Sequence, residues 1–191
     1  MIVLGVDPGT RSTGYAVVEA EGGKVSALAA GCLELHKFGE HAARLQKIWS
    51  KVEGLIREFS PAALAVEAPF YGKNPQATLK LGRAQGVAMA AAMHLDVEVF
   101  EYAPREVKRA VTGNGAASKE QVARMVLTHF AERGLNPEGL GDDAFDALAV
   151  ALTHAYRVHS GGNPTHKSPS ASKKSGGWNA FVQQNPDRIK T

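Results

Sequence analysis

The segment Ile2-Val-Leu-Gly-Val-Asp7-Pro-Gly-Thr10 joins a short run of apolar residues to a carboxylate and a turn. Residues 13–19 and 24–35 have the composition of two further strands, and Glu21-Gly-Gly23 separates them. Tight turns between consecutive strands are typical of an antiparallel meander, so we expect the chain to begin with three such strands. An unpaired carboxylate at the end of a buried strand is costly to remove from water. Asp7 therefore indicates a polar site at the edge of the sheet.

After this meander, helical and extended patterns alternate along the chain. Ala62–Glu67 and Val97–Tyr102 are short apolar runs that predict two more strands. Asn74-Pro75 and the capping box Ser118–Gln121 are typical of helix starts. The expected helices cover residues 40–59, 74–94, 104–113, 118–133 and 143–159. This order predicts an α/β fold with a five-stranded mixed sheet and helices on both faces, in which the strands ending in Asp7 and Glu67 are central neighbours.

The composition is that of a globular domain followed by a basic tail. Of the 191 residues, 44% are apolar and 21% are charged, and no apolar run approaches the roughly 20 residues of a membrane span. Residues 160–191 contain five basic residues and one acidic residue, which accounts for the net charge of +3. We expect one domain over residues 1–159 and a disordered tail, with Trp178 and Phe181 as a candidate docking motif. The single Cys32 and the lack of a secretory signal indicate a cytoplasmic protein.

Four carboxylates from three separate segments are the candidate metal ligands. Asp7 and Glu67 each end a strand, whereas Asp143 and Asp146 lie on one face at the start of the last helix. That helix is apolar almost all round, so an acid within it requires a cation. Carboxylates that converge from separate elements are typical ligands of Mg²⁺. Helix capping is the alternative explanation, and we assign it to Asp142, which is expected to take no part in the chemistry.

Six collinear motifs resemble the RuvC family of Holliday-junction resolvases, which have the ribonuclease H-like fold. They are Gly-Val-Asp-Pro-Gly-Thr-Arg-Ser-Thr-Gly-Tyr (5–15), Val-Glu-Ala-Pro-Phe (66–70), Ala-Thr-Leu-Lys-Leu-Gly-Arg-Ala-Gln-Gly-Val (77–87), Val-Phe-Glu-Tyr-Ala-Pro-Arg-Glu-Val-Lys (99–108), Val-Thr-Gly-Asn-Gly-Ala-Ala-Ser-Lys (111–119) and Asp-Ala-Phe-Asp-Ala-Leu-Ala-Val-Ala-Leu-Thr-His (143–154). The resemblance implies a nuclease domain over residues 1–159 that cuts four-way DNA junctions in recombination and repair. It also implies Mg²⁺ or Mn²⁺, two ions per active site, held by Asp7, Glu67, Asp143 and Asp146.

The resemblance further implies which residues contact DNA. Lys119 is expected to stabilise the charge that develops as the phosphodiester is hydrolysed, which makes it a fifth catalytic residue. Phe70 is expected to stack on bases at the open junction. The other implied DNA contacts are Tyr71, Lys73, Arg83, Arg105 and Lys108, and Arg109 and Arg124 extend the same basic surface. Exposed lysines are usually only solvated, so these assignments depend on the family motifs.

The implied assembly is a homodimer. One domain of this size offers one metal cluster, whereas resolving a junction requires two symmetric cuts, each leaving 5′-phosphate and 3′-hydroxyl ends. Gly82 and Gly86 lie four residues apart on the helix expected at 74–94, and we take this small-residue face as the candidate dimer interface. The RuvA–RuvB branch-migration complex is the implied protein partner, although no residue pattern marks a surface for it.

Three other functions share parts of this pattern. A YqgF-type ribonuclease H-like nuclease has the same Asp-Pro-Gly start but lacks the Lys108 and Lys119 segments and the long helix at 74–94. A junction-binding protein without catalytic activity would not need all four acids. An actin-like ATPase shares the first hairpin but duplicates the domain, and this chain has the length for one copy only.

Overall fold

The computed structural model describes residues 1–68, 74–131 and 135–161, with a five-stranded sheet in the order β3-β2-β1-β4-β5 at its centre. The strands are β1 (Ile2–Asp7), β2 (Thr13–Glu21), β3 (Lys24–Leu33), β4 (Ala63–Glu67) and β5 (Glu98–Tyr102). The β1–β2 and β2–β3 pairs are antiparallel, whereas β1–β4 and β4–β5 are parallel. The predicted mixed sheet is confirmed, and the strands that end in Asp7 and Glu67 are neighbours.

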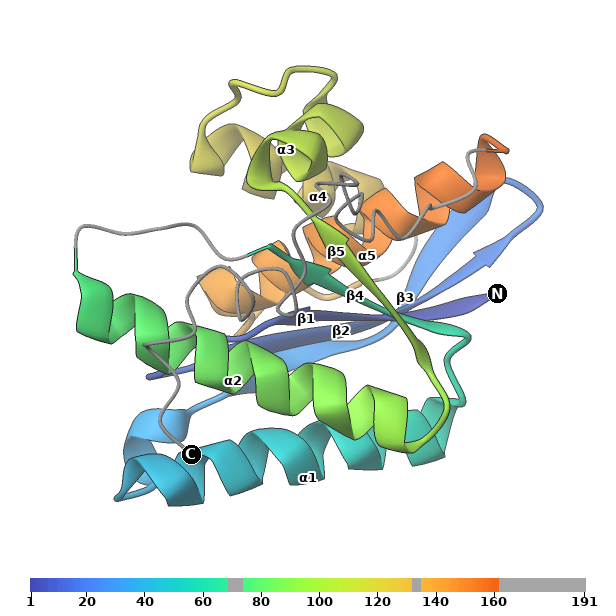
Figure 1. Ribbon diagram of the computed structural model, residues 1–191. Coiled ribbons are helices and arrows are strands. Elements are labelled where there is room, and N and C mark those ends of the chain that lie inside the picture. The colour runs from blue at the N-terminus through green and yellow to red at the C-terminus, as the bar shows by residue number, and fades with distance from the viewer. Residues whose placement is uncertain (69–73, 132–134, 162–191) are drawn as a thin grey trace, which may run out of the picture.

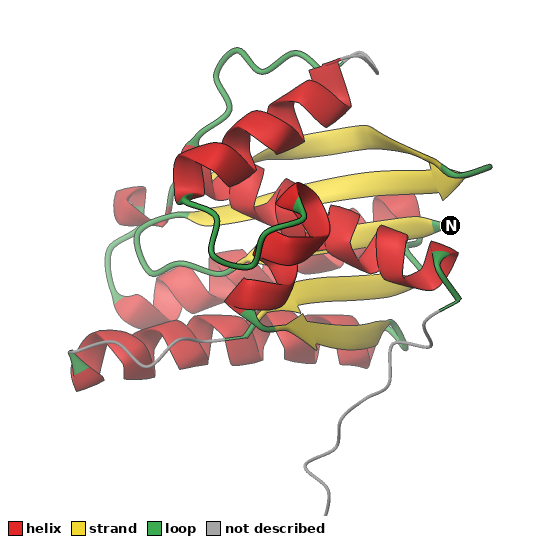
Figure 2. Ribbon diagram, turned by 90° about the horizontal axis from the view of Figure 1, so that it is seen from above, coloured by secondary structure: helices red, strands yellow, loops and turns green. Residues whose placement is uncertain are grey.

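Helices cover both faces of this sheet (Figure 1). They are η1 (Leu35–Lys37), α1 (His41–Phe59), α2 (Pro75–His94), α3 (Pro104–Thr112), α4 (Lys119–Ala131) and α5 (Asp142–His159). In Figure 1, α1 and α2 lie below the sheet, and α3, α4 and α5 lie above it. The view from above places helices both in front of and behind the strands (Figure 2). The arrangement has three layers, as the sequence predicts.

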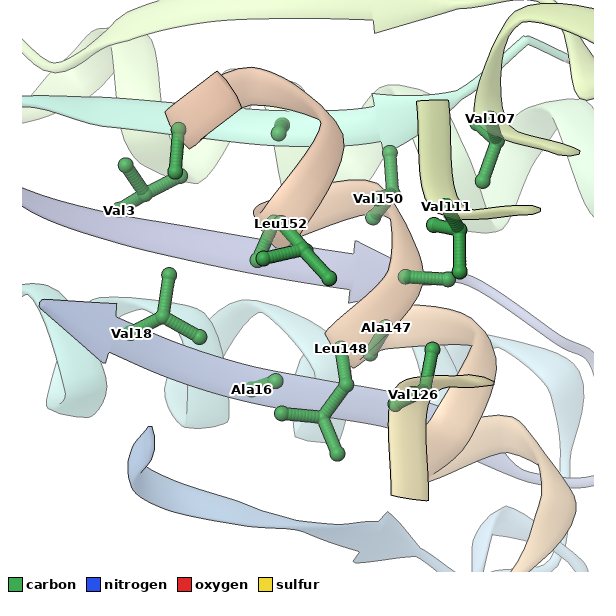
Figure 3. Close-up of a cluster of buried hydrophobic side chains, with 14 of the residues drawn as sticks. Val3, Ala16, Val18, Val107, Val111, Val126, Ala147, Leu148, Val150 and Leu152 are labelled. Carbon is green, nitrogen blue, oxygen red and sulfur yellow. The ribbon is translucent and has the colours of Figure 1, made fainter. Parts of the chain in front are cut away.

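The sheet separates two hydrophobic cores, because successive residues of a strand point to opposite faces. On β1, Val3 belongs to the core beneath α5, whereas Leu4 belongs to the core formed with α1 and α2. Figure 3 shows the first core, in which Val3 and Val18 of the strands lie near Leu148 and Leu152 of α5. Residues 147 to 155 of α5 are buried and mostly apolar. Their burial holds α5 across the central strands.

Two glycines allow α5 to approach the sheet closely at its N-terminal half. A Cβ atom at Gly5 of β1 would overlap the carbonyl oxygen of Ala147, and one at Gly14 of β2 would overlap that of Asp143. Any other residue at these positions would force the helix and the strands apart. The two glycines therefore determine how near the first turns of α5 lie to the end of β1.

The predicted helix caps are confirmed at two helices and wrong at a third. The Asn74 side chain accepts hydrogen bonds from two backbone N–H groups in the first turn of α2, at 3.1 and 3.2 Å. Ser118 and Gln121 form the predicted capping box, with bonds of 2.9 and 3.3 Å. The cap of α5 is Gly141, without a side-chain hydrogen bond, and Asp142 is the first helical residue. The capping role predicted for Asp142 is thus wrong.

Several predictions concern residues that the structure does not describe. The tail predicted for 160–191, including Trp178 and Phe181, lies outside the described residues beyond Gly161, so the domain boundary stays a prediction. The helix end predicted near Arg133 also lies outside them, and the described part of α4 ends at Ala131. Within the described ranges, no helix is both long enough and apolar enough to cross a membrane.

Candidate metal centre

The carboxyl ends of β1 and β4 place Asp7 and Glu67 next to each other at one edge of the sheet. The two strands pair in parallel and in register, and each acid is the last residue of its strand. The first two turns of α5 lie over the same edge, because the glycines of β1 and β2 permit the close approach. Asp143 and Asp146 are therefore brought to Asp7 from the opposite end of the chain.

Three of the four predicted ligands form a compact cluster. Asp7, Asp143 and Asp146 each offer one carboxylate oxygen, and these oxygens lie within 4.8 Å of one another. All three side chains are half-buried, so they are accessible to an ion but only partly hydrated. Glu67 is also half-buried but lies outside this group of three. The predicted aspartate cluster is present, and Glu67 is at its margin.

Burial and mutual repulsion both raise the pKa values of acids in this cluster. Burial, followed by the charges of Asp146, Asp143 and Glu67, raises the pKa of Asp7 from 3.8 to about 7. Burial, followed by the charge of Asp146, also raises the pKa of Glu67. A half-buried cluster of hard oxygen donors with this excess of negative charge fits a divalent cation, which would offset the repulsion.

Lys119 is a cation in direct contact with the cluster. Its Nζ atom lies 2.9 Å from a carboxylate oxygen of Asp146 and 3.8 Å from one of Asp142. Burial alone lowers the pKa of Lys119, but the hydrogen bond to Asp146 and the neighbouring acidic charges outweigh it and raise that pKa. The side chain of Asp142 thus lies beside Lys119 and makes no capping hydrogen bond to α5. The sequence had predicted a capping role only.

The other predicted DNA contacts fall into separate regions. The charge of Lys108 on α3 lowers the pKa of Glu67, although the larger effect of burial raises it. Lys108 is therefore near enough to act on the acids. Arg105 of the same helix packs near Gly115, and Arg83 is exposed on α2, across the sheet from α3. Arg124 lines a cavity of about 220 Å³ between α3 and α4. Phe70, Tyr71 and Lys73 lie outside the described residues.

Four basic residues at the same edge of the sheet were not expected to act together. Arg11, His41, Arg44 and Lys80 line one cavity near the N-termini of α1 and α2. They come from three separate segments, and each is an ordinary polar residue in its own part of the sequence. Arg11 and Lys80 lie within two of the family motifs, but no motif indicates that the four residues share one cavity, because only the packing of α1 and α2 brings them together.

Comparison with known proteins identifies the family. A model of the family described as "Crossover junction endodeoxyribonuclease RuvC" matches residues 3–154 of this chain. The chain belongs to the RuvC family. The RuvC of Cytophaga hutchinsonii is 45% identical over 192 residues, covering 100% of this chain and 88% of that protein. The RuvC of Bacteroides fragilis is 46% identical over 191 residues, covering 99% and 96% of the two chains. The family predicted from the six motifs is thus confirmed.

Solved structures confirm the fold of this RuvC family member. The structure described as "T. thermophilus RuvC in complex with Holliday junction substrate" has a TM-score of 0.77 and 34% identity, and the match covers 85% of this chain and 97% of that one. The yeast mitochondrial Holliday junction resolvase Ydc2 has a TM-score of 0.61 with 15% identity, covering 84% and 81% of the two chains, and supports the fold alone. The resolvase type of ribonuclease H-like fold is therefore confirmed.

Proposed function

We propose that this chain resolves four-way DNA junctions by cutting two symmetric strands in a reaction that requires a divalent metal. One observation carries the proposal: Asp7, Asp143 and Asp146 converge within 4.8 Å in a chain of the RuvC family. Family membership makes the chain a hydrolytic endodeoxyribonuclease. Its setting would be recombination and DNA repair in the cytoplasm.

The ligands of the metal would be the three clustered aspartates, with Glu67 completing the set. Mg²⁺ or Mn²⁺ suits them because all four offer carboxylate oxygens, and two ions per site is the expected number. When bound, such ions lower the pKa of an attacking water and stabilise the departing oxygen. Asp7 lies close to the charges of the other acids, since Asp146, Asp143 and Glu67 all raise its pKa, so it would be a ligand whose charge a bound cation offsets.

The lysines of the site would hold the phosphodiester. Lys119 contacts Asp146 through its flexible side chain, which is about half exposed, so the ammonium can turn towards a phosphate oxygen without a backbone movement. Lys108 on α3 contributes positive charge on the Glu67 side of the cluster. Together they would orient the scissile phosphate and stabilise the charge that develops on it. The expected products carry 5′-phosphate and 3′-hydroxyl ends.

A homodimer would supply the second cut. The outward face of α2 has space for a partner, because a Cβ atom at Gly82 or Gly86 would have no neighbour within 4 Å. Leu79 and Met93 on the same helix are 58% and 57% exposed, so apolar surface is available there for a partner to cover. A twofold contact through this face would relate two metal clusters by one axis, as two symmetric cuts require. The RuvA–RuvB complex stays the partner that the family resemblance implies.

The decisive experiment is a nicking assay on a synthetic four-way junction and on a linear duplex of the same sequence. We expect paired nicks in the junction with Mg²⁺ or Mn²⁺, none with EDTA, and little cleavage of the duplex. Asp7→Asn should lower the rate at least about a hundredfold while junction binding persists. Asp96→Asn is the matched control, because Asp96 is exposed in the turn after α2, where its φ of 58° also suits asparagine. Cleavage by Asp7→Asn within a few-fold of wild type would contradict the metal site.

A further inference from the structure

We propose that the cavity near the N-termini of α1 and α2 binds a backbone phosphate of the junction DNA other than the one that is cut. We call this cavity the basic pocket. It has a volume of about 420 Å³ and is lined by Thr10, Arg11, Gly39, Glu40, His41, Arg44 and Lys80. The inference rests on the proposed function, since it assigns a second contact to the same substrate.

The charge of the basic pocket favours an anion. Arg11, Arg44 and Lys80 are cationic, and Glu40 is the one carboxylate in the lining. The side chains of Arg11 and Lys80 are exposed and make no hydrogen bond or ion pair within the described part of the chain. Two positive charges that no protein group compensates are therefore available to a ligand at the rim of the cavity.

The lining of the pocket also includes a histidine whose ring nitrogen makes no hydrogen bond. Among the described residues, Nε2 of His41 is the one buried side-chain nitrogen or oxygen that lacks a partner. Buried polar atoms are almost always paired, so this nitrogen indicates a group that completes it. His41 is also the first residue of α1, whose cap residue Glu40 makes no side-chain hydrogen bond to the helix. The free N–H groups of that first turn add to the donors that an oxyanion requires.

Arg44 holds the walls of the basic pocket in place. Its Nε donates to the carbonyl oxygens of Phe38 and Gly39 at 2.8 and 3.1 Å, and its Nη1 donates to that of Thr10 at 3.3 Å. The guanidinium thus ties the segment before α1 to the turn after β1. The pocket is formed before any ligand enters it, which lowers the entropic cost of binding.

The position of the basic pocket favours DNA over a free anion. Thr10 and Arg11 belong to the turn that follows Asp7, and both α1 and α2 begin at the sheet edge where the acids lie. A strand whose scissile phosphate lies at the acids would continue along this edge towards α1 and α2. Contacts to neighbouring phosphates are the usual means by which proteins fix the register of a nucleic acid. The occupant we assign is therefore a phosphodiester of the same junction.

The test combines substitutions in the basic pocket with neutral substitutions of single DNA phosphates. The variant Arg11→Gln/Lys80→Gln removes two charges from the pocket and spares Arg44, which supports the loops. The control is Lys24→Gln/Arg57→Gln, which removes two positive charges at the opposite sheet edge, from the start of β3 and the end of α1, where Arg57 gives up its ion pair with Glu53. Both proteins and the wild type are titrated with junctions that carry single neutral methylphosphonate groups, in EDTA so that no cleavage occurs.

We expect one methylphosphonate, away from the cleavage point, to weaken wild-type and control binding about three- to tenfold and to leave the pocket variant unaffected. The slope of log affinity against log salt concentration should also become shallower in the pocket variant, by about 0.9 for each phosphate that it no longer neutralises. Equal methylphosphonate effects in all three proteins would overturn the inference. Binding of inorganic phosphate can be followed by ¹⁵N NMR of His41. If the pocket variant loses phosphate binding but binds the junction as tightly as the control, the inference is also overturned.

The cleavage assay separates failure of this inference from failure of the proposed function. If the wild type cuts junctions but no methylphosphonate position couples to Arg11 and Lys80, the assignment of the pocket alone is wrong. If the wild type neither binds nor cuts junctions, the proposed function is wrong, and the assignment of the pocket is wrong with it.

Discussion

At the scale of single residues, Asp7, which we propose as a metal ligand, has an unfavourable effect on stability. Its folded-state pKa of about 7 lies above the ordinary value of 3.8, mainly because of burial. A carboxyl of this kind binds its proton more tightly in the folded state, so it destabilises the fold progressively as the pH rises between those values. The proposed metal ligand Asp7 is therefore unfavourable for folding when no metal is bound.

Asp7→Asn should accordingly stabilise the metal-free protein. In EDTA at pH 8, we expect its free energy of unfolding to rise by about 1–3 kcal/mol, because each pKa unit corresponds to about 1.4 kcal/mol. Urea unfolding measures this change, with Asp96→Asn as a control that should remain near wild type. Added Mg²⁺ should then raise the melting temperature of the wild type and have little effect on Asp7→Asn. A metal-free Asp7→Asn protein that is less stable than wild type would contradict this account.

His154 provides a second, pH-dependent contribution to stability. It is 2% exposed, its Nδ1 lies 2.7 Å from the hydroxyl of Tyr102, and burial lowers its pKa from 6.5 to about 4. Between these two values the unfolded chain binds the proton better than the folded one. The stability due to neutral His154 is therefore complete above pH 6.5 and is lost as the pH falls towards 4.

His154→Gln removes this titration and should make stability less dependent on pH. We expect the loss of unfolding free energy between pH 7 and pH 5 to shrink by about 1–2 kcal/mol relative to wild type. Urea titrations at the two pH values measure it, and the exposed His36→Gln variant is the control. An unchanged pH dependence in His154→Gln would mean that other groups cause the acid sensitivity.

The sequence predicted most individual residues of the site but not all of their contacts. Asp7, Asp143 and Asp146 were identified because acids at strand ends and in an apolar helix are physically unusual. The capping role of Asp142 was wrong, because α5 begins one residue earlier than expected, with Gly141 at the cap. The basic pocket was not predicted, although Arg11 and Lys80 lie in quoted motifs, since its residues come together only through helix packing.

At the scale of elements, the close packing of α5 on the sheet sets the positions of Asp143 and Asp146. A Cβ atom at Gly14 would overlap the carbonyl oxygen of Asp143, so Gly14→Ala should push the first turn of α5 away from β2. We expect a loss of about 1–3 kcal/mol in unfolding free energy, as for an overpacked core, and a fall in junction cleavage at temperatures where the variant is fully folded. Melting curves and nicking rates measure the two effects separately.

Gly54→Ala is the matched control for this prediction. Gly54 lies within α1, and a Cβ there would have no neighbour within 4 Å. Replacing a helical glycine by alanine at an open site should stabilise the protein by about 0.5–1 kcal/mol and leave cleavage unchanged. If Gly14→Ala behaved like Gly54→Ala in both assays, the close approach of α5 would not be what places the aspartates.

The elements themselves were largely predictable, since local chemistry specifies them. The Asn74 cap and the Ser118–Gln121 box start α2 and α4 where expected, because these contacts lie within one turn. The strand predicted at 24–35 instead ends at Leu33, and Leu35 begins the short helix η1. That boundary was not predictable, because Leu35 is fully buried in the core with α1 and α2, and such packing has no local signature.

At the scale of the whole molecule, the proposed dimer can be tested by blocking α2. Gly86→Arg places a long charged side chain on the exposed face that carries Gly82. We expect light scattering to report a monomer, and paired cuts in a cruciform plasmid to give way to single nicks. Gly54→Arg makes the same change on α1 and should remain dimeric. A monomeric Gly86→Arg that still linearises the plasmid at the wild-type rate would contradict the dimer mechanism.

The placement of Asp7 on β1 and of Asp146 on α5 has a consequence for protein synthesis. Asp7 is synthesised about 140 residues before Asp146, and the two side chains can meet only once α5 has docked on the sheet. Until then, the sheet face with Val3 and Val18 also lacks its cover. A nascent chain, or one released early by a stalled ribosome, therefore cannot assemble the aspartate cluster, so the proposed cleavage would begin only after residue 146 has been synthesised and α5 has docked.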